Sequence, residues 1–218
     1  MTTTLSISSL SRRQGDAGCE RPILAPLTRS FEPGKLSVVT GPSGAGKTTL
    51  LSLLSLAVPA TSGTIRHGAT DLGELDPVAA QRWRRTRLGM VFQTSRLIKM
   101  LSVAEHIELA AMLRPAGDAH QRGLDLLDRL GLGDKLAARP SELSAGEKRR
   151  VALAQAMCIE PEIILADEPT AALDSVDAQL VSSCLRDYAR RSNAVVICVS
   201  QDRQIIDNAD DLLTLEKS

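Results

Sequence analysis

Apolar and polar residues divide the chain into two regions of alternating strands and helices, separated by a helical middle. The runs EIILA (162–166) and AVVICV (194–199) are continuously apolar, as are strands buried on both faces of a parallel sheet. Between them, six residues recur at helical spacing: Val176, Leu180, Val181, Cys184, Leu185 and Tyr188. This spacing predicts a helix packed on the sheet, and the alternation predicts an α/β fold.

The N-terminal region opens with two strand signals, LSIS (5–8) and ILAPLTRSF (23–31). The tetrapeptide EPGK (32–35) contains proline and glycine and leads into the apolar LSVVT (36–40), so a hairpin is expected across it. A glycine-rich loop then enters a leucine-rich segment whose apolar residues cover nearly all helical faces. That pattern predicts a buried helix.

The middle of the chain, roughly 94–155, has a helical pattern. Ser102 and Glu105 form an S-x-x-E capping box, which predicts the start of one helix. Its expected apolar face consists of Val103, Ile107 and Ala110. A second predicted helix carries Leu124, Leu127 and Leu130 on one face and ends at a glycine. A third helix is expected after SELSAGE (141–147).

The segment GPSGAGKT (41–48) matches the phosphate-loop pattern GxxxxGK[ST], with a predicted strand before it and a helix after it. Its glycines let successive backbone N–H groups point at phosphate oxygens. Lys47 is expected to reach the β- and γ-phosphates, and Thr48 to bind Mg²⁺. A glycine-rich turn that only starts a helix is the alternative. The predicted nucleotide-binding residues here are Gly41, Pro42, Ser43, Gly44, Ala45, Gly46, Lys47, Thr48 and Thr49.

Two carboxylates follow the predicted strand 162–166. Asp167 is placed to hold Mg²⁺ through a water molecule, and Glu168 to act as general base on an attacking water. Adjacent strand residues point to opposite faces, but the chain turns at the end of the strand, so both carboxylates can border the phosphate pocket. Two exposed carboxylates ahead of Pro169 are the alternative for this stretch taken alone.

The segment LSAGEKRRVALAQAM (143–157) narrows the class of protein. Ser144 and Glu147 form a capping box, which needs no ligand. The same hydroxyl, helix N-terminus and backbone N–H groups can also bind an anion. Together with the phosphate loop and IILADEPTAALD (163–174), the segment resembles the LSGGQ or LSGGE signature of ATP-binding subunits of ABC transporters. Ala145 stands where the family has a glycine.

The resemblance covers essentially the whole chain. It implies a P-loop NTPase (RecA-like) core with an antiparallel β subdomain and an inserted α-helical subdomain. One domain is expected over 1–218, with a core of about 1–92 and 156–218 and a helical arm of about 93–155. The implied cofactors are ATP and Mg²⁺, and the implied partners are a second copy of the chain and an integral-membrane permease.

Residue roles are likewise implied by the resemblance. The signature residues press on the γ-phosphate held by the other copy: Ser144, Ala145, Gly146 and Glu147. Asp174, in ALD (172–174), faces the dimer partner, and Gln93, in VFQ (91–93), senses Mg²⁺ and transmits to the permease. The implied catalytic residues are Glu168, Gln201, Lys47 and Gln93. The implied metal ligands are Thr48, Gln93 and Asp167.

Two positions depart from the family pattern. Relatives have a histidine after the last buried strand, where this chain reads Ser200-Gln201-Asp202. Gln201 can donate a hydrogen bond but cannot become a cation, so we hypothesise slowed hydrolysis. Relatives usually place an aromatic that stacks on adenine near SRRQGDAG (11–18), where this chain offers Arg13 and Gln14. Weaker discrimination between ATP and GTP is expected, unless the Arg13 guanidinium stacks instead.

Within the family, LGMVFQTSRLIKMLSVAEHIELA (88–110) resembles the stand-alone ATPases of lipoprotein-release and macrolide-export systems. The expected function is therefore an ATPase subunit that dimerises around two ATP and drives a separate permease, of export or mechanotransmission type. One alternative is a hydrolysis-impaired, ATP-dependent clamp, which Gln201 motivates. Another is a soluble ABC protein that acts on nucleic acid.

Composition argues against the last alternative. Lys+Arg and Asp+Glu both number 26, so the formal net charge is zero and no global basic field attracts nucleic acid. Aromatic residues amount to 2%, which is few for a surface that stacks bases. The four scattered cysteines fit a reducing compartment. Neither a signal peptide nor a membrane-spanning run is expected, so we predict a cytoplasmic protein held at the cytoplasmic face of the membrane by its permease.

Overall fold

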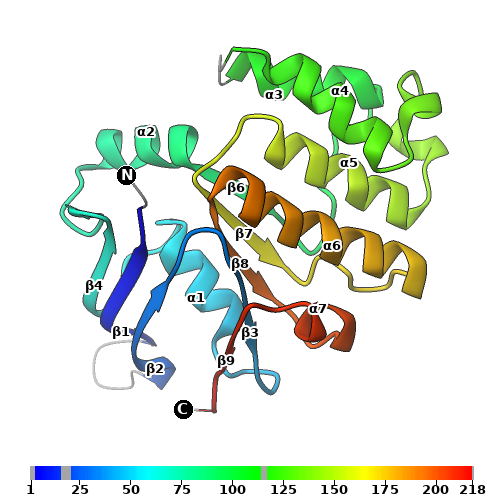
Figure 1. The fold of residues 1–218 in the computed structure, drawn as a ribbon. Helices are drawn as coiled ribbons and strands as arrows, with labels where there is room; N and C mark the ends of the chain where they lie inside the picture. The colour runs from blue at the N-terminus through cyan, green and yellow to red at the C-terminus, as the bar shows by residue number, and fades with distance from the viewer. Residues whose placement is uncertain (1–2, 16–20, 114–116, 218) are drawn as a thin grey trace.

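A computed structural model describes residues 3–15, 21–113 and 117–217. Its strands form an antiparallel sheet and a parallel sheet (Figure 1). The antiparallel sheet, in the order β2-β1-β4-β5, contains β1 Leu5–Gln14, β2 Arg21–Phe31, β4 Ser62–His67 and β5 Thr70–Asp71. The parallel sheet, in the order β6-β7-β8-β3-β9, contains β3 Leu36–Thr40, β6 Leu88–Val91, β7 Ile163–Asp167, β8 Val195–Val199 and β9 Asp211–Thr214.

Helices cover both faces of the parallel sheet (Figure 1). They are α1 Lys47–Leu54, α2 Pro77–Arg87, α3 Val103–Leu113, α4 Ala119–Arg129, α5 Ala145–Met157, α6 Ser175–Ser192 and α7 Arg203–Asp207. Two short 3-10 helices, η1 Gly133–Lys135 and η2 Pro140–Glu142, lie between α4 and α5. Cys19 lies outside the described residues.

The parallel sheet separates two hydrophobic clusters, because neighbouring residues of its buried strands point to opposite faces. Val196 and Cys198 of β8 face the cluster formed with α3, α4, α5 and α6. Val195 and Ile197 face the cluster formed with α1, α2 and the antiparallel sheet. The prediction of buried parallel strands in 162–166 and 194–199 is therefore confirmed.

The predicted hairpin across 32–35 is wrong. The turn exists, with Gly34 at φ 77°, but it joins strands of different sheets. β2 pairs with β1, whereas β3 lies between β8 and β9. The burial of β3 gives the reason: its first four residues are buried, so it needs neighbours on both edges and helices on both faces, which a hairpin partner alone does not provide.

The helical middle agrees with its predicted pattern. The capping box of α3 is formed, with Ser102 N–H donating to Glu105 Oε2 at 2.6 Å and Glu105 N–H donating to Ser102 Oγ at 3.3 Å. Ile107 and Leu127 are fully buried where α3 packs on α4. The helix α4 ends just before Gly131, at φ 69°. The boundary between core and helical arm stays a prediction.

Two local features differ from the sequence pattern. The helix α2 was not predicted, because its apolar content is low; Asp76 caps it and Trp83 is its buried residue. In α6, Val176 is 76% exposed, so its assignment to the packed face is wrong. Its place in the first turn of α6 puts it ahead of the segment that covers the sheet, which begins with Ala178 and includes Val181.

Candidate nucleotide-binding site

The phosphate loop joins β3 to α1 at the edge of the parallel sheet. Gly46 caps α1 with φ 89°, and a Cβ at this position would lie 2.5 Å from the carbonyl oxygen of Ile23, so the close approach of β2 requires glycine. Lys47 is buried, and its ammonium donates to the carbonyl oxygens of Gly41 and Pro42 at 2.7 and 3.0 Å. These contacts hold the lysine over the loop.

A cavity of about 320 Å³ brings most of the predicted residues together. It lies at the carboxyl ends of β3, β6, β7 and β8, because parallel strands end at one edge of their sheet. Its lining consists of Ile23, Ser43, Gly44, Gly46, Lys47, Thr48, Thr49, Gln93, Asp167, Glu168, Val199 and Gln201. Gly41 and Pro42 adjoin it through their contacts with the lysine.

The two carboxylates after β7 both reach this cavity. Glu168 has φ 45°, and its N–H donates to the Val199 carbonyl at 2.8 Å, so the chain turns at the end of the strand. Burial raises the pKa of Glu168, against a lowering by the Gln201 backbone N–H. Burial also raises the pKa of Asp167, partly offset by the Thr48 hydroxyl and the Lys47 charge. A glutamate with a raised pKa is a stronger base once ionised.

Gln201 follows β8 and its side chain extends to the phosphate loop. Its amide Nε2 donates to the Gly41 carbonyl at 3.3 Å, so it shares this acceptor with Lys47. The preceding Ser200 is fully buried, and its N–H donates to Val39 of β3 at 3.1 Å. The backbone just before Gln201 is therefore fixed to the edge of the sheet.

Arg149 is a site residue that sequence reasoning missed. Arg149 is only 5% exposed, and its guanidinium donates to the backbone carbonyls of Phe92, at 2.5 Å, and Gln93. Burial lowers the pKa of Arg149. Through these bonds α5 holds the backbone of Gln93 at the cavity. The KRR run (148–150) contained the signal, but the sequence pattern does not tell a buried arginine from the exposed ones beside it.

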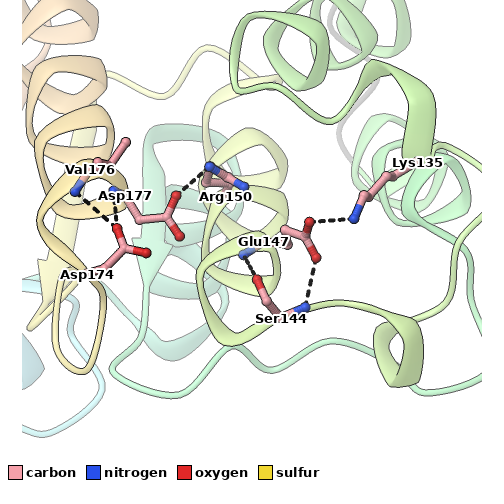
Figure 2. Close-up of polar contacts among 7 residues, drawn as sticks. All are labelled: Lys135, Ser144, Glu147, Arg150, Asp174, Val176 and Asp177. Atoms are coloured by element: carbon pink, nitrogen blue, oxygen red, sulfur yellow. Dashed lines mark hydrogen bonds and ion pairs between the residues drawn. The ribbon is translucent and has the colours of Figure 1, made fainter.

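The signature segment, 144–147, lies away from the cavity. Among the described residues that line the cavity, none comes from 144–147 or from Asp174. Figure 2 shows the capping box of α5: Glu147 N–H donates to Ser144 Oγ at 3.1 Å, and Ser144 N–H donates to Glu147 Oε2 at 2.8 Å. Lys135 Nζ binds the other carboxylate oxygen of Glu147 at 2.5 Å. In one chain, this segment forms a helix cap and no part of the cavity.

Asp174 is also a helix cap. Its Oδ1 accepts from the N–H groups of Val176 and Asp177 at 3.0 and 2.8 Å, which starts α6 (Figure 2). The N-termini of α5 and α6 therefore each carry a hydroxyl or carboxylate cap. The signature residues and Asp174 thus lie on a surface that is separate from the cavity.

Comparison with known proteins decides the family. The family model described as ABC transporter matches residues 24–171. The chain belongs to the ABC transporter family. It has the P-loop ATPase fold of that family. One structural neighbour is the ATP-binding cassette MJ0796, solved as a dimer bound to ADP and phosphate, with a TM-score of 0.87, 26% identity, and coverage of 98% of this chain and 94% of that chain.

Curated relatives in sequence carry transporter names. An uncharacterised ABC transporter ATP-binding protein of Mycobacterium bovis is 36% identical over 97% of this chain, which spans 64% of that relative's length. A lipoprotein-releasing system ATP-binding protein LolD of Rhodopirellula baltica is 33% identical, with coverage of 97% and 93%. A macrolide export ATP-binding/permease protein MacB of Burkholderia thailandensis is 36% identical, with coverage of 94% and 32%.

The predicted adenine position of this ABC protein lies near the cavity. Arg13 pairs with Pro22 across β1 and β2, directly beside Ile23 of the cavity lining. Arg13 and Gln14 are both exposed, and residues 16–20 lie outside the described residues. Within the described ranges, no helix has both the length and the apolar character needed to cross a bilayer.

Proposed function

We propose that this chain is the ATP-hydrolysing subunit of an ABC transporter, that it dimerises around two ATP molecules, and that it drives a separate permease of export or mechanotransmission type. One observation carries the proposal. The phosphate loop, Glu168 and Gln201 line the cavity, while the Ser144 segment lies outside it as an exposed helix N-terminus. A second copy can supply this anion-binding segment. The dimeric state of the MJ0796 cassette supports this arrangement.

The cavity also fits Mg²⁺. Thr48, Gln93 and Asp167 bring a hydroxyl, an amide oxygen and a carboxylate to it, all of them the hard oxygen donors that Mg²⁺ prefers. Bound Mg²⁺ would neutralise phosphate charge during hydrolysis. Arg149 keeps the Gln93 backbone at this edge, so we propose that it supports the amide ligand indirectly.

The chain's own residues suggest the division of labour in hydrolysis. We propose that Lys47 turns from the Gly41 and Pro42 carbonyls to the β- and γ-phosphates when ATP enters. Glu168 accepts the proton of the attacking water, which its raised pKa favours. Gln201 donates an amide hydrogen bond to the γ-phosphate but adds no charge, so turnover is slower than with histidine at this position.

A groove beside Gln93 suits the permease. It has a volume of about 350 Å³ and lies between α2 and β6 on one side and α3 and α5 on the other. Arg85, Phe92 and Leu113 are among its lining residues, and Leu113 is 62% exposed. We propose that a cytoplasmic segment of the permease binds here and holds the chain at the cytoplasmic face of the membrane. Direct membrane insertion and nucleic-acid binding form no part of the proposal.

The test uses the full chain with Glu168→Gln, which blocks the proposed base and preserves ATP binding. Sedimentation velocity with ATP and Mg²⁺ is expected to give a dimer, and the same protein with ADP a monomer. A strictly monomeric ATP complex, both alone and together with the permease, would overturn the proposal. Glu108→Gln, an exposed change on α3, is the matched control and should leave turnover unchanged.

Gln201 favours one alternative, an ATP-dependent clamp that dimerises but hardly hydrolyses. Steady-state turnover by the assembled complex separates the two functions. Turnover that requires Glu168 supports the ATPase, whereas a nucleotide-dependent dimer without turnover supports the clamp.

A further inference from the structure

An ion pair joins the N-terminal turns of α5 and α6. Arg150 Nη1 lies 2.5 Å from Asp177 Oδ1, and the side chains are only 14% and 17% exposed (Figure 2). Arg150 lies in the second turn of the helix that Ser144 caps, and Asp177 lies in the first turn of the helix that Asp174 caps. The pair therefore connects the two segments that the proposed dimer presents to the partner copy.

The same two helices touch at Gly146. This glycine is buried, and a Cβ built on it would overlap the carboxylate of Asp177. Ala145, one residue earlier, is exposed and has replaced the family glycine. A glycine is therefore required at 146, the second glycine position of the signature, because the Asp177 carboxylate occupies the space that a Cβ would need.

The bonding of Asp177 is divided between the two segments. Its backbone N–H donates to Asp174 Oδ1 at 2.8 Å, so its main chain belongs to the cap of α6. Its side chain holds α5 through Arg150, whose Nε is buried and has no hydrogen-bond partner among the described residues. A displacement of either segment therefore moves the other. Ion pairs with this little exposure resist solvent screening better than surface pairs do.

We infer that Asp177 is a positioning residue for the partner's nucleotide, because it fixes the Ser144 and Asp174 segments in one relative arrangement through Arg150 and Gly146. The inference rests on the proposed function, in which both segments meet the other copy. Asp177 itself touches no nucleotide. Its loss should weaken closure of the dimer without changing how a single chain binds ATP at its own phosphate loop.

A simpler role for Asp177 is to complement the dipole at the N-terminus of α6. That role predicts a small loss of stability and no dependence on Arg150. A double-mutant cycle distinguishes the two roles, because residues in contact show non-additive effects and independent residues do not.

The experiment uses the full chain with Glu168→Gln and measures ATP-dependent dimerisation by sedimentation. Asp177→Asn and Arg150→Gln are each expected to raise the dimer dissociation constant roughly tenfold, and the double variant no further. Gly146→Ala should give the same defect by displacing Asp177. Asp187→Asn is the matched control, since it breaks the exposed pair with Arg191 at the other end of α6. ATP binding to the monomer, read with a fluorescent analogue, should not change.

The outcomes separate failure of the proposed function from failure of the role inferred for Asp177. If the Glu168→Gln parent does not dimerise with ATP, the proposed function fails and this inference fails with it. If the parent dimerises and both Asp177→Asn and Arg150→Gln dimerise equally well, the inference alone is wrong. Additive effects, or an equal defect in Asp187→Asn, assign Asp177 a structural role only and also overturn it. Should Gly146→Ala fail to fold, the isosteric Asp177→Asn variant still carries the test. On the wild-type background, kcat should fall while KM for ATP stays the same.

Discussion

The phosphate-loop cavity and the signature end of the chain are built in opposite ways. In the cavity, Lys47, Glu168 and Gln201 line an open pocket at the edge of a parallel sheet, and Lys47 and Gln201 donate to a backbone carbonyl of the phosphate loop. At the signature end, Ser144 and Asp174 act as helix caps. The first region forms a cavity within one chain, whereas the second keeps its shape by itself and, in the proposed dimer, would meet a ligand held by the other copy.

The largest expected effect comes from replacing Glu168, the proposed general base in the cavity. Glu168→Gln should lower ATP turnover by about 10²- to 10⁴-fold, because it removes the proton acceptor and leaves the phosphate loop unchanged. Phosphate release, measured with the permease complex, checks this, and Glu108→Gln is the control. Turnover within twofold of the parent would mean that another group accepts the proton, and the role given to the cavity would be wrong.

Gln201→His should give the next largest effect, in the opposite direction. A histidine reaching the same phosphate can carry charge, so we expect a gain in kcat of roughly tenfold, which is smaller than the effect of removing a complete oxyanion-hole donor. Gln201→Ala should be slower than the parent, since it also loses the amide donor. If histidine gives no gain, the explanation of Gln201 as a handicap is wrong.

A third prediction compares two capping boxes in the same chain. Ser144→Ala and Ser102→Ala remove the same kind of cap from α5 and α3, so each should cost about 1 kcal/mol of unfolding free energy in urea. Only Ser144→Ala should also impair the ATP-dependent dimer, because its hydroxyl is proposed to meet the partner's phosphate. Equal dimerisation by both variants would leave Ser144 with capping as its sole role.

Much of the fold could be predicted because its signals are local. Continuous apolar runs marked β7 and β8, and the S-x-x-E boxes marked α3 and α5. The pairing of β3 could not be read in this way. A turn at Gly34 looks the same whether the next strand folds back or enters another sheet, and the choice depends on burial by distant elements. The helix α2 was missed because Trp83 supplies most of its apolar contact.

In the candidate site too, local features could be predicted from the sequence and contacts between distant segments could not. Its phosphate loop and strand-end carboxylates follow from motif and order, because parallel strands must end at one edge. The contacts of Arg149 and Asp177 could not be anticipated, since they join α5 to segments 57 and 27 residues away. A charged residue in a helix gives no sign of which distant loop it meets. Such contacts come from the packing of the two helices and not from spacing along the chain.

The smallest predicted effect concerns Lys135, which holds the carboxylate of the α5 cap. Hydrogen bonds from Lys135 and the Ser144 backbone lower the pKa of Glu147, so the stability from the ionised carboxylate is present above the ordinary glutamate pKa of 4.5. That stability is lost as the pH falls through the lowered pKa. Lys135→Gln should therefore unfold at a lower urea concentration than the parent near pH 7, and the difference should disappear in acid. Lys148→Gln, one residue further along α5, is the control and should show no such pH dependence. A Lys135→Gln difference that persists below the lowered pKa would mean that the lysine stabilises α5 by packing and not by charge.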